Sequence, residues 1–299
     1  MTSLRDILLV ARFEVLRAIR TWRAVALFLL YAIAYGGAAY VFLAILHALE
    51  NQVARQLGVA TTDTPGALLG PLLKSEMFQE MVLGMTGNPR LVEEVAVIPP
   101  LAIFAMWLGL LLIPFFAASA SAECISIDMA SRALRFEALR TGRLELVLGR
   151  FVGQLVLTAV ASGVAAVVVW GMGMTMMVGN SPLQLAYWLV VLTGKAWSFS
   201  IPFAGLGVAA SCLTTSPAWA RVMAIGATAG SWVVYAVARY FEGGTYTIFA
   251  DLTLQLLPQG WLRMLWEPGF GWLLPALVCA TLGAAAVGLG FARFAARDL

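Results

Sequence analysis

Residues 24–46 read AVALFLLYAIAYGGAAYVFLAIL, an uncharged apolar stretch that decides the fold. A helix needs about 20 such residues to cross the hydrocarbon core of a bilayer, so this stretch predicts a membrane-spanning helix. Comparable stretches recur along the chain, and together they predict an all-α integral membrane protein with six transmembrane helices. The other five predicted spans are residues 97–120, 151–178, 196–213, 222–238 and 271–291.

The composition predicts a single transmembrane domain over residues 1–299. Hydrophobic residues make up 61% of the chain and charged residues only 12%, whereas soluble domains carry about 25% charged residues. A water-soluble surface of this size cannot be built from so few charges. The one histidine and the three cysteines follow no metal-binding or disulfide spacing, so no metal site is expected in this chain.

The N-terminal segment, residues 1–23, predicts an amphipathic helix that lies on the membrane surface. Its apolar residues recur at helical spacing, and its arginines occupy the other faces. Glu14 and Arg17, three residues apart, are expected to pair on the exposed surface, where such a pair contributes little. No cleavable signal peptide is expected, because the arginines interrupt any compact apolar core. The apolar positions are Leu4, Ile7, Leu8, Ala11, Val15, Leu16 and Ile19.

The fourth apolar region, residues 183–214, is too long for one perpendicular span. Because Gly194 and Lys195 interrupt it, residues 183–194 are interpreted as an interfacial or re-entrant piece that precedes the span at 196–213. Two interpretations of Lys195 follow: it lines a path for an anionic cargo, or it extends its ammonium group to the external interface. The predicted break in the helix favours the second interpretation.

The charged segments predict the orientation in the membrane. The two termini, residues 121–150 and the turn at 214–221 hold 13 of the 19 Lys and Arg residues. Cytoplasmic loops are enriched in Lys and Arg, so both termini are predicted to be cytoplasmic. Residues 47–96 then form an extracytoplasmic loop, within which residues 67–85 predict a short helix on the bilayer.

Enzyme motifs are missing from the sequence. It contains no GxxxxGK[ST] phosphate loop, HExxH zinc motif or GxSxG nucleophile motif, so neither ATP hydrolysis by this chain nor a hydrolase is predicted. The predicted spans contain no Asp or Glu, whereas ion-coupled transporters keep acidic residues in the membrane. The energy for any transport is therefore expected to come from elsewhere.

Two sequence patterns, one of glycines and one of methionines, are interpreted as residues that pack between helices. The glycine-rich stretches 205–207 and 283–290 allow helices to approach closely and predict tight helix packing rather than a pore. Methionines cluster on the predicted external side, at 77–85 and 172–177. They are interpreted as apolar filling rather than a Cu(I) site, because no His or Cys accompanies them.

Three segments match short motifs of one known family of membrane proteins. The first is ARFEVLRAIRTW, residues 11–22, in which Glu14, Arg17 and Arg20 match the family's N-terminal helix. The second is ECISIDMASRALRFEALRTGRLELVLGRF, residues 123–151. Its matching positions are Glu123, Leu139, Arg143, Leu148, Gly149 and Arg150.

A third segment also matches the family, and the second segment departs from the family pattern at two places. The ending RFAARDL, residues 293–299, is similar to the end of the family's chains. In the second segment, residues 128–130 replace the family's Gly-Thr, and residues 141–142 replace its Pro. The predicted topology also resembles the family's, with six spans, cytoplasmic termini and a long first external loop.

Together the three segments resemble the permease subunits of ABC type-2 exporters. The resemblance implies a permease that pairs with a second copy or a homologue and exports a substrate across the bacterial inner membrane. A separate ATPase subunit would hold ATP and Mg, and residues 121–150 would be the cytoplasmic coupling segment that docks on it. For the arginines of this segment, the alternative is an anchoring role towards lipid head groups. The ATPase-contact candidates are Glu123, Arg135, Arg140, Arg143 and Arg150, and Glu14, Arg17 and Arg20 mark the N-terminal helix.

Other partners and functions stay open in the sequence. Residues 47–96 could bind a periplasmic protein, and no nucleic-acid partner is expected. One alternative function is a non-transport subunit that anchors or assembles a cell-surface machine. Another is an unassisted secondary transporter.

Overall fold

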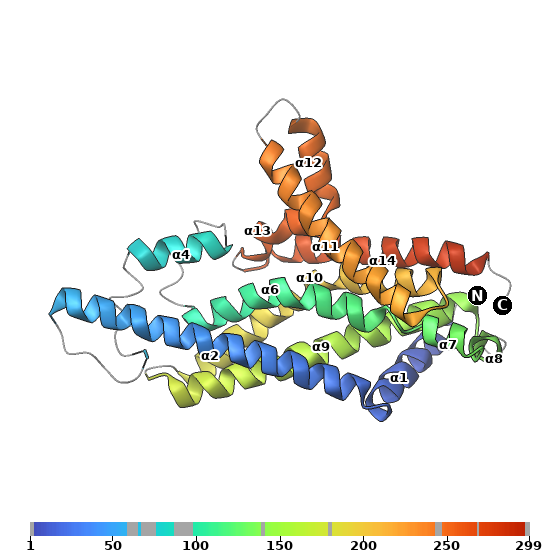
Figure 1. The fold of residues 1–299 in the computed structure, drawn as a ribbon, viewed down its shortest axis with the longest axis horizontal. Coiled ribbons are helices and arrows are strands. Elements are labelled where there is room, and N and C mark those ends of the chain that lie inside the picture. The colour runs from blue at the N-terminus through green and yellow to red at the C-terminus, as the bar shows by residue number, and fades with distance from the viewer. Residues whose placement is uncertain are drawn as a thin grey trace.

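The computed structural model describes residues 3–58, 65–66, 76–86, 98–138, 141–178, 181–242, 247–267 and 269–296. All regular structure within these residues is helical (Figure 1). In chain order the helices are α1 (Leu4–Arg20), α2 (Arg23–Leu57), α4 (Glu76–Thr86), α6 (Pro100–Ser121), α7 (Ser126–Ala130), α8 (Leu134–Ala138), α9 (Arg143–Met176), α10 (Pro182–Leu213), α11 (Pro217–Phe241), α12 (Thr247–Leu256), the 3-10 helix η1 (Pro258–Trp261), α13 (Leu262–Leu265) and α14 (Leu273–Ala295).

Six helices of the described chain are long and apolar enough to cross a membrane, namely α2, α6, α9, α10, α11 and α14. The protein is therefore an all-α, multi-pass membrane protein, as the sequence predicts. The start of α1 and the end of α14 lie at the same end of the bundle (Figure 1). We term this the terminal end; α7 and α8 also lie there.

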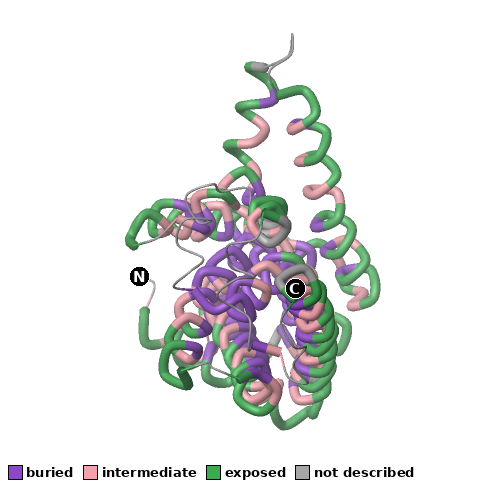
Figure 2. The backbone as a smooth tube through the Cα atoms, turned by 90° about the vertical axis from the view of Figure 1, so that its left-hand side faces the viewer, coloured by how far each residue is buried: buried purple, intermediate pink, exposed green. Residues whose placement is uncertain are grey.

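Helix α10 forms the centre of the bundle. Of its most apolar stretch, 72% is buried, compared with 17% for α11. It packs against α6, α9, α11 and α14, and the buried residues gather in the interior of the bundle (Figure 2). Phe199 and Phe203 on α10 and Leu101 and Met106 on α6 are fully buried there. The central position also removes the polar side chains Lys195, Ser198 and Ser211 of α10 from the lipid.

Glycines bring α10 and α14 into close contact. A methyl group added at Gly205 would lie 2.5 Å from the carbonyl oxygen of Gly283, and one at Gly290 would lie 2.6 Å from the Cα of Ala209. Only glycine fits at such distances, so these residues allow backbone-to-backbone packing. The predicted packing role of the glycine-rich stretches is confirmed.

The predicted interruption before residue 196 is wrong. Helix α10 runs unbroken from Pro182 to Leu213 and passes through Gly194 and Lys195. A glycine inside a helix costs only about 1 kcal/mol, which the packing of α10 against its neighbouring helices outweighs. Residues 183–194 are therefore the first turns of this helix and not a separate re-entrant piece.

The first span is also longer than predicted. Helix α2 continues to Leu57 and so contains Glu50, whose buried carboxylate accepts the backbone N–H of Gly66 at 2.8 Å. The expectation that no span holds an acidic residue is thus wrong for α2. The predicted short helix at 67–85 is found as α4, Glu76–Thr86, and most of the remaining loop lies outside the described residues.

Helices α11 and α12 form a hairpin that stands out from the bundle (Figure 1). The start of α11 is fixed by Ser216, whose hydroxyl accepts the N–H of Trp219, and by Pro217 at the first helical position. Apolar side chains such as Val233 and Val237 are exposed along it. An exposed apolar surface of this kind is typical of a helix that faces lipid.

Candidate functional site

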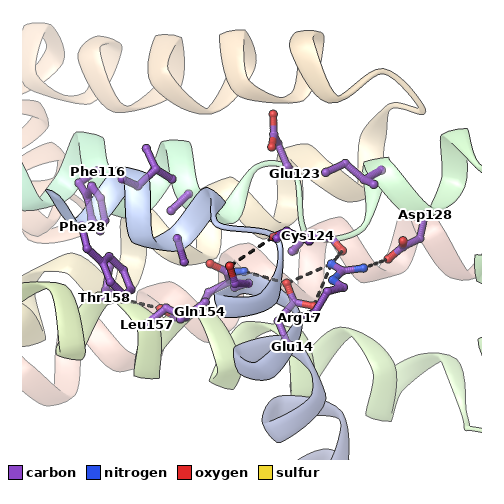
Figure 3. Close-up of a pocket in the computed structure, with 16 residues that line it drawn as sticks. Glu14, Arg17, Phe28, Phe116, Glu123, Cys124, Asp128, Gln154, Leu157 and Thr158 are labelled. Carbon is purple, nitrogen blue, oxygen red and sulfur yellow. Dashed lines mark hydrogen bonds and ion pairs between the residues drawn. The ribbon is translucent and has the colours of Figure 1, made fainter. Parts of the chain in front are cut away.

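A cluster of charged side chains joins four elements at the terminal end of the bundle. Glu14 and Arg17 come from α1, Asp128 from α7, Glu137 from α8 and Arg150 from α9; we term these five residues the ionic cluster. Figure 3 shows the part that borders a pocket. Arg150, Glu14 and Asp128 are 2%, 3% and 7% exposed. These three charged side chains therefore lie in the protein interior, whereas Arg17 and Glu137 are partly exposed.

Two glycines of α9 bring α1 onto the cluster. A methyl group at Gly149 would lie 2.6 Å from the Cβ of Val10, and one at Gly153 would lie 2.9 Å from the Cβ of Glu14. These glycines are four residues apart and so line one face of α9. They form the groove in which α1 lies, and this contact places Glu14 against α9.

Arg17 connects α1 to α7. Its Nη2 lies 2.9 Å from Oε2 of Glu14, and its Nη1 lies 2.6 Å from Oδ2 of Asp128. Gln154 of α9 donates from Nε2 to Oε1 of Glu14 at 3.0 Å. The predicted pairing of Glu14 with Arg17 is confirmed, but its predicted place on the exposed surface is wrong, because Glu14 is buried beneath α1.

Arg150 completes the ionic cluster from the side of α9. It pairs with Asp128 and with Glu137, and it also donates a hydrogen bond to the backbone carbonyl of Cys124. Arg17 donates to that same carbonyl at 3.3 Å. The turn between α6 and α7 is therefore held by both arginines.

Opposite charges compensate one another within the ionic cluster. Burial of Arg17 lowers the pKa of its guanidinium, but the carboxylates of Glu14 and Asp128 raise that pKa by more, so the net shift is upward and Arg17 stays charged. With three carboxylates and two guanidinium groups, the cluster carries a formal charge of −1. Removal of one partner from a buried ion pair costs about 3–5 kcal/mol, because the other charge stays buried.

A second anchor holds the same turn from α10. The hydroxyl oxygen of Ser211 accepts the backbone N–H groups of Ile125 at 2.9 Å and of Ser126 at 2.8 Å. Ser211 is fully buried, so water cannot replace its hydroxyl oxygen as the acceptor for these two N–H groups. The start of α7 is thus fixed to the central helix of the bundle.

The other residues predicted to contact an ATPase lie in different places. Glu123 pairs with Arg221 of α11 at 2.6 Å, and Arg143 donates to the carbonyl of Ala295, at the end of α14, at 2.9 Å. Arg20 is exposed at the end of α1. Arg140 and the side chain of Arg135 lie outside the described residues.

Lys195 lies in the interior of the protein and not at its interface, and its role on a path for an anionic cargo stays a prediction. It is 4% exposed, and its Nζ donates to the carbonyl oxygen of Glu267 at 2.7 Å. The predicted extension of the ammonium group to the interface is wrong, because the continuous helix α10 carries Lys195 into the interior. The side chain there ties α10 to the end of α13 and the turn that follows it.

A pocket of about 550 Å³ lies beside the ionic cluster, between α1, α2, α6 and α9 (Figure 3). Arg17, Glu14 and Asp128 form one side of it, and Phe28 and Phe116 form the other. The described part of the chain contains no group of three or more His, Cys, Asp or Glu side chains placed to hold a metal ion.

Sequence reasoning missed Asp128, Glu137, Gln154 and Ser211. Asp128 is visible in the sequence only as a departure from the family pattern, and its role depends on contact with Arg17, 111 positions away. The one local signal is the Gly149–Gly153 spacing, which is typical of close helix contact. No protein-family model matches the chain, and a comparison with curated proteins gives no match either.

Proposed function

We propose that this chain is the transmembrane permease subunit of an ABC transporter and works with a separate ATPase to export a substrate across the bacterial inner membrane. The main support is that the ionic cluster brings Glu14 and Arg17 into one unit with Arg150. Glu14 and Arg17 belong to the first segment that carries the resemblance, and Arg150 belongs to the second.

The ionic cluster suits the transmission of movement. A displacement of α7 reaches α1 through the Asp128–Arg17 pair and reaches α9 through the Asp128–Arg150 pair. Helix α6 precedes the segment directly, and Ser211 fixes that turn to α10. Tightly packed elements move as rigid bodies. A partner that moved residues 121–150 would therefore move several membrane helices together.

The contacts separate two roles among the candidate residues of the coupling segment. Glu123, Arg143 and Arg150 each bind another part of the chain, so we assign them to holding the segment in position. Docking on the ATPase is assigned to Arg135 and Arg140. The exposed aromatic ring of Phe136, which lies next to Arg135, offers an apolar anchor for the same contact.

The proposal includes an orientation and a set of partners. The terminal end lies in the cytoplasm, and the exposed Leu4, Leu8 and Phe13 of α1 face the inner leaflet. A second copy of the chain, or a homologue, completes the pore. ATP and Mg are bound by the ATPase subunit, so hydrolysis takes place outside this chain.

Affinity purification of the tagged chain in mild detergent, followed by mass spectrometry, tests the proposal. We expect a stoichiometric nucleotide-binding subunit, and we expect Arg140→Glu to release it. Arg263→Glu, a charge reversal at an exposed residue between α12 and α14, serves as the matched control and should leave the complex intact. A chain that purifies alone would favour an unassisted carrier.

A further inference from the structure

The outward face of α1 mixes apolar and basic side chains. The opposite face packs against α9 through Ala11 and Glu14. On the outward face, large apolar side chains are exposed along the whole helix, and three exposed arginines lie among them. The apolar residues are Leu4, Leu8, Leu9, Phe13, Leu16 and Ile19, and the arginines are Arg5, Arg12 and Arg20. A partner that covers this face must therefore accept both hydrocarbon and positive charge.

The positive charge of this face is not neutralised by α1 itself. Within the residues that the structure describes, none of the three arginines forms a salt bridge. Of the acidic residues of α1, Glu14 is buried and paired with Arg17, and Asp6 is half-buried at the edge of the face. The outward face therefore attracts a partner of negative charge.

Two membrane-spanning helices place α1 at the boundary of the hydrocarbon layer. Only two residues separate α1 from α2, whose residues 24–46 carry no charge. On α9, α1 packs against Gly149 and Gly153. Arg150 lies between these glycines and is the last charged residue before the uncharged stretch 151–178. Helix α1 thus lies at the level at which charged side chains end on α2 and α9, where lipid head groups are found (Figure 1).

We propose that the outward face of α1 binds anionic phospholipids, of the phosphatidylglycerol type. The arginines contact the lipid phosphates, and the leucines and Phe13 enter the adjoining hydrocarbon, as in other basic amphipathic helices at a membrane interface. Each arginine near an anionic surface strengthens binding about fivefold. The exposed Trp22, at the corner between α1 and α2, suits the same interface. This inference is independent of the proposed transport function.

Quenching of a fluorophore on α1 by labelled lipids tests the binding. The full-length chain with Leu9→Cys carries the fluorophore at position 9, because the three native cysteines are buried. It is reconstituted in phosphatidylcholine vesicles that contain a minor amount of phosphatidylglycerol, and equal amounts of either lipid carry a nitroxide quencher near the head group. We expect labelled phosphatidylglycerol to quench severalfold more strongly than labelled phosphatidylcholine. Equal quenching by the two lipids, or quenching by neither, would overturn the proposal.

Charge-neutralising variants assign the binding to the arginines of α1. Arg5→Gln combined with Arg12→Gln should lower the preference for phosphatidylglycerol severalfold. The matched control is Arg55→Gln combined with Arg263→Gln, which removes the same charge from exposed positions on α2 and α13 and should leave the preference unchanged. An unchanged preference in the α1 variant, or an equal loss in the control, would contradict the assigned face.

Ionic strength gives the same test without any change to the arginines, should the α1 variant not fold. High salt screens the attraction between exposed charges, so it should weaken the preference for phosphatidylglycerol at position 9. A preference that high salt leaves unchanged would contradict recognition of the lipid charge.

Discussion

Arg17 of α1 and Arg150 of α9 bind the same carboxylate oxygen, Oδ2 of Asp128, and both donate to the backbone carbonyl of Cys124. The two arginines come from helices that are separated in sequence by the first two membrane-spanning helices, α2 and α6. Their shared acceptors make Asp128 the point at which α1, α7 and α9 meet. The consequences of this arrangement can be measured.

Asp128→Asn is expected to lower the stability of the protein substantially. The change removes the carboxylate that the half-buried Arg17 and the buried Arg150 share, and removal of one partner from a buried ion pair costs about 3–5 kcal/mol. Thermal unfolding in detergent measures the effect as a lower Tm. Asp251→Asn, at an exposed carboxylate on α12, is the control and should leave the Tm nearly unchanged.

The shared acceptor also predicts non-additive effects of two substitutions. Once Asp128 is replaced by Asn, the further change Arg17→Gln should cost less than it does in the wild type, because the removed guanidinium has already lost a partner. A double-mutant cycle on the Tm or on the free energy of unfolding measures this coupling. Strictly additive losses would contradict the connection between the two side chains.

Gly149→Val is expected to displace α1 from α9. The new side chain would begin 2.6 Å from the Cβ of Val10, and overpacking of this kind costs about 1–3 kcal/mol. The displacement can be followed by placing a cysteine at the buried Ala11 and measuring its rate of reaction with a thiol reagent. We expect Gly149→Val to raise that rate. Gly163→Val, also on α9 but with no atom within 4 Å of an added Cβ, should leave that rate unchanged.

Ser211→Ala is expected to loosen the start of α7. The substitution removes the acceptor of two buried backbone N–H groups, those of Ile125 and Ser126, and an unsatisfied buried donor costs about 1–3 kcal/mol. The Tm should fall accordingly. Ser131→Ala, at an exposed serine of the same segment, is the control. Equal Tm values for the two variants would rule out an anchoring role for Ser211.

Lys195 gives a prediction about charge in the interior. Lys195→Met replaces the ammonium group by an apolar chain of similar length and should cost little, because exchange of a buried charge for a well-packed apolar group is often tolerated. Lys195→Glu would direct a carboxylate at the carbonyl oxygen of Glu267 and should destabilise the protein severely. Comparison of the two Tm values tests this difference, and a greater loss in Lys195→Met would contradict it.

The sequence predicted the membrane fold well, because an apolar stretch long enough to cross a bilayer is a local signal. It also placed Glu14, Arg17 and Arg150 among the candidate residues. It did not predict that these residues meet, because contacts across more than a hundred positions depend on how the helices pack. Lys195 was misread because Gly194 suggested a helix break, whereas a carbonyl acceptor at Glu267 stabilises the buried ammonium group.

The most direct test of the proposed coupling role is site-specific photo-cross-linking in cells from position 136. Phe136 is exposed on α8, at the terminal end of the bundle. Phe270 is exposed just before the first residue of α14, and α14 runs from there to the terminal end. A photoreactive phenylalanine analogue replaces one or the other. The account predicts a cross-link from position 136 to a nucleotide-binding subunit and none from position 270. A cross-link from 270 alone, or none to such a subunit from 136, would contradict it.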